Sequence, residues 1–277
     1  MTFFQELLIA LVQGITEFLP ISSSGHLILI PALTGWPDQG IITDVMVHVG
    51  SLFAVIVYFW RDVLMLGHGA LDVARGRVTQ RSRLFTYIVL ATIPALAFGA
   101  FLKFSGTSAA IRGPLIVAWG AVVFSIAMYL ADRFGARAKT MADMRLRPAL
   151  LIGLSQAVAL IPGTSRSGIT MTAARAMGYE RGEAARFSFL LGIPAITAAG
   201  LFTALEAWED GRAVPPDALL AAFFSFFAAL AAIAFLMALV KRTTLTVFVI
   251  YRLALALVLF AMIYGWFPDW LPPLATR

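Results

Sequence analysis

A carboxylate, a hydroxyl and an imidazole lie close together near the start of the sequence. Glu17, Ser23 and His26 fall in one short stretch, Gln13-Gly-Ile-Thr-Glu-Phe-Leu-Pro-Ile-Ser-Ser-Ser-Gly-His26. Such a set can supply a nucleophile, a base and an orienting carboxylate, or a site for a hydrated cation, in phosphoryl transfer. By itself the set is weak evidence, because a histidine in a membrane protein often only hydrogen-bonds neighbouring helices.

A second polar segment, in the other half of the chain, contains an arginine. In Gly163-Thr-Ser-Arg-Ser-Gly168, Arg166 follows small polar residues and opens a short apolar run. If a helix begins here, its free N–H groups, its positive dipole end and the hydroxyls converge on an anion. The planar guanidinium suits a phosphate or carboxylate. The alternative is that the hydroxyls only cap a broken helix while Arg166 pairs with Glu17.

The composition indicates what kind of protein must position these residues. The chain is 60% hydrophobic and only 13% charged, with a mean hydropathy of +0.87, against roughly 45–50% and 25% in soluble domains. A soluble globular enzyme is therefore excluded. The sequence has no cysteine, so disulfides, thiolate metal sites and cysteine nucleophiles are excluded as well. Its 22 glycines and 13 prolines suit packed, broken transmembrane helices better than a barrel. The predicted fold class is all-α, in a single membrane domain over residues 1–277.

Apolar runs divide this domain into spans and broken segments. Two regions, 3–34 and 149–178, each consist of two short apolar runs around a polar break, which is typical of a re-entrant helix–loop–helix hairpin. Glu17 and the lack of basic residues before the first run argue against a signal peptide. The remaining apolar runs reach the roughly 20 residues that a crossing needs; they are 41–60, 84–102, 113–131, 187–205, 218–240 and 244–266.

The positive charges support this layout. Lys and Arg number 14 in segments 61–83, 132–147, 176–186 and 241–242, but only four in segments 35–44, 103–112, 206–217 and 267–277. The split obeys the positive-inside rule only if each broken region returns to the side it entered from. The basic segments are then cytoplasmic and face anionic lipid, so the net charge of +6 does not imply nucleic acid. The prediction is a polytopic integral membrane protein with six full transmembrane helices and two re-entrant hairpins.

The two hairpins form an internal repeat. Gln13 to Gly25 can be laid over Gln156 to Gly168, with Ser22 over Ser165. Each repeat, about 1–131 and about 149–266, then holds one hairpin and three spans. Three is an odd number, so the second repeat is inverted and the two polar tips meet within the membrane. The predicted site collects residues of both tips: Gln13, Glu17, Ser22, Ser23, Ser24, His26, Gly163, Thr164, Ser165, Arg166, Ser167, Gly168 and Thr170.

These motifs resemble the undecaprenyl-diphosphatase family associated with bacitracin resistance. The likeness is carried by Gln13 to His26 and Pro162 to Gly168, and it extends through Phe187–Pro194 and Tyr251-Arg252. It implies hydrolysis of undecaprenyl diphosphate to undecaprenyl phosphate and inorganic phosphate, which regenerates the lipid carrier for peptidoglycan and other cell-wall polymers. It also implies a divalent cation, Mg²⁺ or Ca²⁺, held by Glu17, substrate oxygens and water, and a site that opens to the outer, periplasmic face of a bacterial inner membrane.

Glu17, Ser23, His26 and Arg166 are the predicted catalytic residues, and the other tip residues are predicted to bind the substrate. Ser23 is the preferred nucleophile, with His26 as its base; His26 itself, or a water activated by Glu17 or the cation, are the rivals. A transporter or flippase for an anionic lipid is the alternative function, because inverted hairpins are also a transporter architecture. The expected partners are the polyprenyl diphosphate and the bilayer, and a homodimer is left open.

Overall fold

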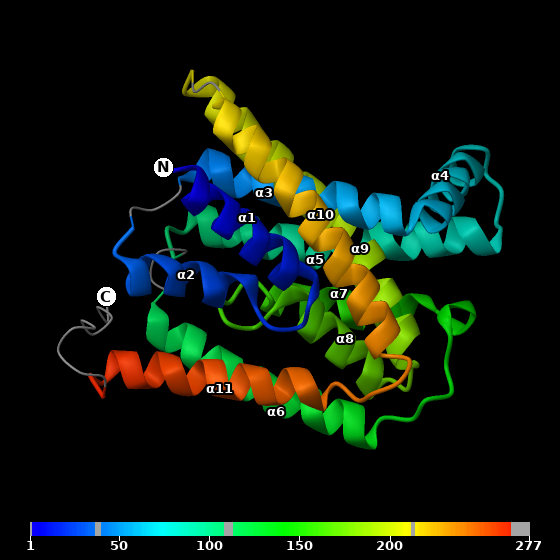
Figure 1. Cartoon of the computed structure of the whole chain (residues 1–277). Helices are drawn as coiled ribbons and strands as arrows, with labels where there is room; N and C mark the ends of the chain where they lie inside the picture. The colour runs from blue at the N-terminus through cyan, green and yellow to red at the C-terminus, as the bar shows by residue number, and fades with distance from the viewer. Residues whose placement is uncertain (1, 37–39, 108–112, 212–213, 267–277) are drawn as a thin grey trace.

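The computed structural model describes residues 2–36, 40–107, 113–211 and 214–266. Over these ranges the chain forms eleven α-helices, one short 3-10 helix and no β-sheet, which confirms the predicted all-α class (Figure 1). In chain order the elements are α1 (Phe3–Phe18), α2 (Ser23–Thr34), α3 (Ile41–Tyr58), α4 (Trp60–Ala74), α5 (Gln80–Phe104), α6 (Pro114–Phe134), η1 (Met141–Asp143), α7 (Leu146–Val158), α8 (Arg166–Ala176), α9 (Arg181–Glu209), α10 (Pro216–Leu239) and α11 (Thr246–Ile263).

Two pairs of short helices form the predicted hairpins. The start of α1 lies beside the end of α2, where the rings of Phe4 and Trp36 are 6.2 Å apart. The segment that leads into α7 likewise returns to the segment after α8, where Lys139 forms a bridge with Tyr179. Figure 1 shows the first hairpin opening to the end of the bundle where the chain begins, and the second opening to the opposite end, near α4. The two hairpins therefore enter the bundle from opposite ends, as an inverted repeat requires.

The spans also agree with the sequence prediction, and helix α4 is an additional element. Five helices of the described ranges are long and apolar enough to cross a membrane, namely α5, α6, α9, α10 and α11, and α3 provides the sixth crossing when it is taken together with α4. An 88° bend at this junction turns α4 away from α3. The sequence prediction treated residues 61–83 as a connecting segment only. Most of that segment is helix α4, which Asp62 and Asp72 tie to α9 and α5 through ion pairs with Arg186 and Arg81.

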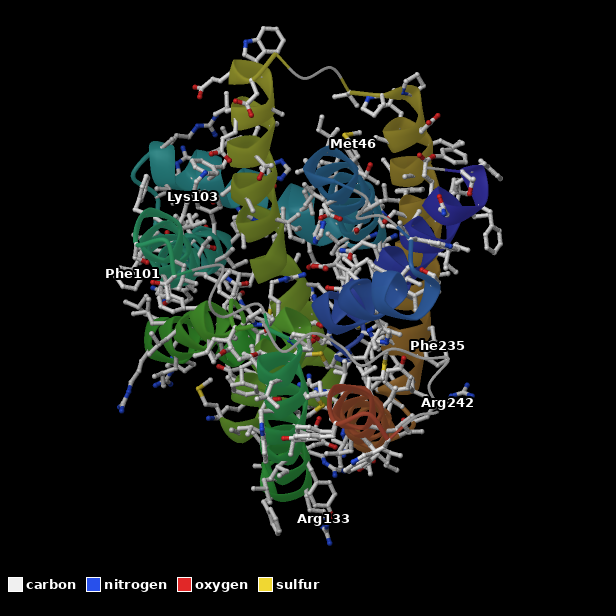
Figure 2. All side chains as sticks on the ribbon, turned by 90° about the vertical axis from the view of Figure 1, so that its left-hand side faces the viewer. Met46, Phe101, Lys103, Arg133, Phe235 and Arg242 are labelled. Atoms are coloured by element: carbon white, nitrogen blue, oxygen red, sulfur yellow. The ribbon has the colours of Figure 1, made fainter. Side chains whose placement is uncertain are left out.

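Glycines allow neighbouring helices to pack closely against one another. Gly50 of α3 lies against the carbonyl of Ala222 on α10, and Gly153 of α7 lies against the carbonyl of Ala91 on α5, so a side chain at either glycine would collide with backbone. Large apolar side chains outside these contacts point away from the bundle. Phe101 and Phe235 project from opposite sides in Figure 2 and are 60% and 55% exposed. Such side chains suit contact with lipid tails.

Candidate active site at the two hairpin tips

The two hairpins turn in the same unusual way. Ser22 has a φ of 75° and Ser165 a φ of 69°, and these are the only non-glycine residues of the described chain with a positive φ. They occupy equivalent positions in the repeat, and each directly precedes the second helix of its hairpin. A non-glycine residue in this conformation costs roughly 1–3 kcal/mol, which the surrounding structure must offset, and such strain is concentrated at functional sites. The two turns aim Ser23 and Arg166, the first residues of α2 and α8, into one region.

Glu17 is the centre of that region. One of its carboxylate oxygens accepts hydrogen bonds from Gln13 Nε2 at 2.9 Å and from Ser23 Oγ at 3.1 Å. The other oxygen lies 3.2 Å from Nη2 of Arg166, which comes from the opposite hairpin. His48 of α3 completes the set, with Nε2 at 3.6 Å from the carboxylate. The carboxylate is buried, so these partners take the place of water around its charge.

The tip of the second hairpin is bonded to the first. Ser167 Oγ donates to the carbonyl of Leu19 at 3.2 Å, and Ser165 Oγ accepts from the N–H of Gly168, as an N-cap does. Thr170 faces elsewhere, because its hydroxyl lies 2.6 Å from Ser188 Oγ on α9. The predicted residues therefore come together at the two tips, except that Thr170 is engaged by α9. The side chain of Ser24 lies outside what the structure describes.

His26 does not contact Ser23. Its Nδ1 lies 2.8 Å from the carbonyl of Ser22, so this nitrogen carries the hydrogen, and its Nε2 lies 2.5 Å from the hydroxyl of Tyr251 on α11. The two rings are also stacked, with centroids 5.6 Å apart. Because both ring nitrogens have other partners, the carboxylate of Glu17 is the basic group in contact with Ser23. The predicted hydroxyl–imidazole pair is thus replaced by a hydroxyl–carboxylate pair.

Several polar atoms at the tips have no hydrogen-bond partner. Within the described chain they include Oε1 of Gln13, Oγ1 of Thr164 and Nη1 of Arg166, all buried. Buried polar atoms are nearly always hydrogen-bonded, so a cluster of unpartnered ones fits a polar ligand. The guanidinium and hydroxyl are donors suited to phosphate oxygens, while the Gln13 oxygen is an acceptor. The same described residues contain no group of three acidic or histidine side chains able to hold a metal ion by themselves.

Arg252 of α11 contacts the backbone of both hairpin tips. It is fully buried and donates to the carbonyls of Gly163 and Thr164 at 2.9 Å each, with a longer contact of 3.5 Å to the carbonyl of Pro20. Its Nε is bonded to Ser125 Oγ on α6 at 2.9 Å. The sequence placed Arg252 and His48 inside spans, where a helix-packing role fits equally well, and only the fold shows that both reach the site.

Gly192 of α9 makes room for Arg166. A Cβ at Gly192 would overlap the Arg166 guanidinium, whereas a Cβ at Gly200 of the same helix would meet nothing within 4 Å. We expect Gly192→Ala to preserve the fold but to lower the activity of the site by about 10- to 100-fold, because small displacements of a group that binds or reacts with a substrate have effects of this size. Gly200→Ala is the matched control, since both changes add one methyl group to α9. Equal activities of the two variants would show that the space at Gly192 does not position Arg166.

Comparison with known proteins shows the family of this chain. Residues 6–258 match the family described as "Bacitracin resistance protein BacA". A protein of Erythrobacter litoralis named undecaprenyl-diphosphatase is 49% identical over 283 residues, covering 94% of this chain and 99% of that protein. Another of that name, from Ruegeria pomeroyi, is 50% identical over 268 residues, covering 96% of this chain and all of its own length. The chain therefore belongs to the bacitracin resistance protein BacA family.

Proposed function

We propose that this chain hydrolyses undecaprenyl diphosphate to undecaprenyl phosphate and inorganic phosphate at the two hairpin tips. The name of its relatives supports the reaction, and those relatives align over nearly the whole chain. The observation that carries the assignment to this site is the contact of Glu17 with both Ser23 and Arg166, which joins a base, a hydroxyl and a phosphate-binding group across the two hairpins. The product is the lipid carrier of cell-wall synthesis, and bacitracin resistance is part of the family's description.

Arg166 binds the terminal phosphate in this mechanism, because its Nη1 is buried without a partner while Nη2 is held by Glu17. Ser23 Oγ attacks the terminal phosphorus as Glu17 takes its proton. The bond from that phosphorus to the bridging oxygen breaks, and undecaprenyl phosphate leaves with the bridging oxygen and with the proton that Glu17 took from Ser23. Water then attacks the phosphoserine as Glu17 accepts a proton from the water. Glu17 passes this proton to Ser23 Oγ as inorganic phosphate is released and Ser23 is restored.

His26 as nucleophile and direct attack by water are the rival routes. A rapid-quench experiment with substrate labelled in the terminal phosphate separates the three. The Ser23 route leaves acid-stable label on the protein, the His26 route leaves acid-labile label, and direct water attack leaves none. The contact between Ser23 and Glu17 favours the first route, because no contact of this kind joins Ser23 to His26.

A divalent cation, Mg²⁺ or Ca²⁺, is part of the proposal. The residues fit a cation that shares the substrate: Glu17 offers a carboxylate, and Gln13 offers a buried amide oxygen without a partner. Mg²⁺ is commonly bound by one or two carboxylates together with substrate phosphates and water. When bound, it would neutralise charge on the diphosphate and polarise its oxygens. Arg166 and Ser23 would act on the substrate from their positions beside Glu17.

The site is proposed to open to the outer face of the bacterial inner membrane. The basic segments 61–83, 132–147, 176–186 and 241–242 carry most of the chain's Lys and Arg, so the end of the bundle that holds them is assigned to the cytoplasm. The first hairpin, which carries Glu17 and Ser23, opens to the other end (Figure 1). Association of two copies is a separate prediction, which the mass of the purified protein in detergent would test.

Cysteine labelling checks this orientation. The chain has no native cysteine, so Val214→Cys and Ala138→Cys each introduce a single thiol, at one exposed position for each end of the bundle. An impermeant thiol reagent added to intact spheroplasts should label Cys at 214 and should label Cys at 138 only after lysis. The reverse pattern would place the first hairpin on the cytoplasmic side.

Release of phosphate by the purified protein tests the function itself. Hairpins inserted from opposite ends are also found in transporters, so movement of an anionic lipid is the second candidate function. Detergent solution has no second compartment, and only a hydrolase can produce inorganic phosphate from undecaprenyl diphosphate there. Turnover in detergent is the expected result. Binding of the lipid without any phosphate release would favour the transporter.

A further inference from the structure

A cavity that contains none of the tip residues lies at the end of the bundle assigned to the cytoplasm. It has a volume of about 1000 Å³ and is formed by the start of α5, the segment around η1, and residues of α4 and α9. Four arginines contribute to its wall, from three separate stretches of the chain: Arg81, Arg83, Arg145 and Arg186. The reaction proposed above uses no group in this cavity, and the positive-inside rule does not explain why these arginines line one cavity.

Two of these arginines already have acidic partners. Arg81 donates to Asp72 from Nε at 2.5 Å and from Nη2 at 3.1 Å. The Arg81 hydrogen bond lowers the pKa of Asp72 to about 2, so this pair keeps its charges at neutral pH. Arg186 pairs with Asp62 of α4 and lies 3.6 Å from Glu183. The charge of these two side chains is balanced within the protein.

Arg83 and Arg145, in contrast to Arg81 and Arg186, have no acidic partner among the described residues. Both are exposed, and neither makes an ion pair in the described part of the chain. The one carboxylate in the wall is that of Asp143, which accepts from the N–H of Thr140 at 2.9 Å and from its hydroxyl at 3.1 Å. These bonds lower the pKa of Asp143, and the nearby charge of Arg145 lowers it further. Because no carboxylate of the described chain lies within ion-pair distance of Arg83 or Arg145, both guanidinium groups can still bind an anion that enters the cavity.

Apart from Thr79 and Gln80, the rest of the wall is largely apolar. Leu84 and Met144 are nearly buried, and Met65 and Tyr87 line the cavity beside them. A free inorganic anion would gain nothing from these side chains, whereas an amphiphile would place its first carbons against them and its charge near the arginines. The cavity therefore combines the two kinds of surface that a lipid presents at the membrane boundary.

We propose that this cavity binds a phosphate group, with Arg83 and Arg145 as its ligands. An anionic phospholipid of the inner leaflet and free inorganic phosphate share this chemistry, and the apolar wall favours the phospholipid. Arginine binds phosphate through parallel N–H donors, and two arginines without an ion-pair partner in the described chain line this cavity. Bound lipid would bridge the α4–α5 connection to the segment that leads into the second hairpin.

The test measures lipid binding to the full-length protein by native mass spectrometry in detergent. The probes are phosphatidylglycerol, phosphatidylcholine and inorganic phosphate. The test variant is Arg83→Ala with Arg145→Ala. The control is Arg133→Ala with Arg242→Ala, two exposed arginines that do not line the cavity and lie at the edge of the bundle in Figure 2. Phosphate release and thermal stability of each variant report whether it is folded.

Wild type and control should bind phosphatidylglycerol equally, and the test variant should bind it about 10- to 30-fold more weakly, since each basic residue contributes about 1 kcal/mol to such contacts. Phosphatidylcholine should bind weakly and equally to wild type, control and test variant.

Displacement of phosphatidylglycerol by millimolar phosphate in wild type would support the site with free phosphate as a second ligand. Unchanged phosphatidylglycerol binding by the test variant, or the same loss in the control, would overturn the proposal. If the double variant does not fold, Arg83→Gln and Arg145→Gln singly should each weaken binding several-fold.

Discussion

Replacing Glu17 with glutamine should reduce phosphate release by about 10²- to 10⁴-fold, the range that a positioned general base contributes. The amide keeps the size of the side chain, but it cannot take the proton of Ser23 and it removes the negative partner of Arg166. The loss should appear in kcat at saturating substrate, measured as inorganic phosphate released by the purified protein.

Glu6→Gln is the matched control for this change. Glu6 lies on the same helix and, like Glu17, has 8% of its surface exposed, but it lies in the first turn of α1, away from the tip. Activity of the control near that of wild type would assign the effect to position 17 rather than to the loss of any carboxylate from α1. Recovery of Glu17→Gln at high Mg²⁺ would indicate that the carboxylate acts mainly as a cation ligand. Full activity of Glu17→Gln without added cation would contradict both the role of Glu17 as a general base and its role as a cation ligand.

Arg166→Lys should lower kcat/KM by about 10²- to 10³-fold, although the positive charge is retained. The lysine ammonium can still pair with Glu17, but it lacks the second, oriented nitrogen that Arg166 leaves buried and unpartnered. Oriented donors of this kind stabilise charge that develops on phosphoryl oxygens, and removing one costs several kcal/mol.

Arg147→Lys provides the comparison, because Arg147 is an exposed residue of the same hairpin, on α7. A steady-state comparison of the two lysine variants with wild type is sufficient. Turnover by Arg166→Lys at the rate of Arg147→Lys would show that charge alone is required at position 166, and the role of the second nitrogen would have to be abandoned.

The overall architecture could be predicted from the sequence because its signals are local. A crossing needs a long apolar run, and a hairpin shows as two short runs around a polar break, so the bounds of α5, α6 and α10 lie within four residues of the predicted ones. Helix α4 was not predicted, because it lacks such a local apolar signal. It is a short helix with charged residues at the end of a span, and its position depends on ion pairs with distant arginines.

The composition of the site was predictable, but its pairing was not. Repeat alignment brought Glu17 and Arg166 together, because inversion places the two tips at the same depth. Spacing along one hairpin also suggested that His26 would be the base that accepts the proton of Ser23. In the fold, the imidazole of His26 instead contacts the hydroxyl of Tyr251 on α11. These two residues are 225 positions apart in the sequence, so no local pattern predicts their contact.

Arg252 has a consequence for how the protein is made. Its side chain binds carbonyls of the second hairpin and reaches the first, yet it belongs to α11, the final helix of the described chain. A ribosome delivers both hairpins to the membrane long before it delivers this arginine. The nascent protein therefore holds Glu17, Ser23 and Arg166 before Arg252 is present, and this arginine can join the two loops only after α11 has been inserted.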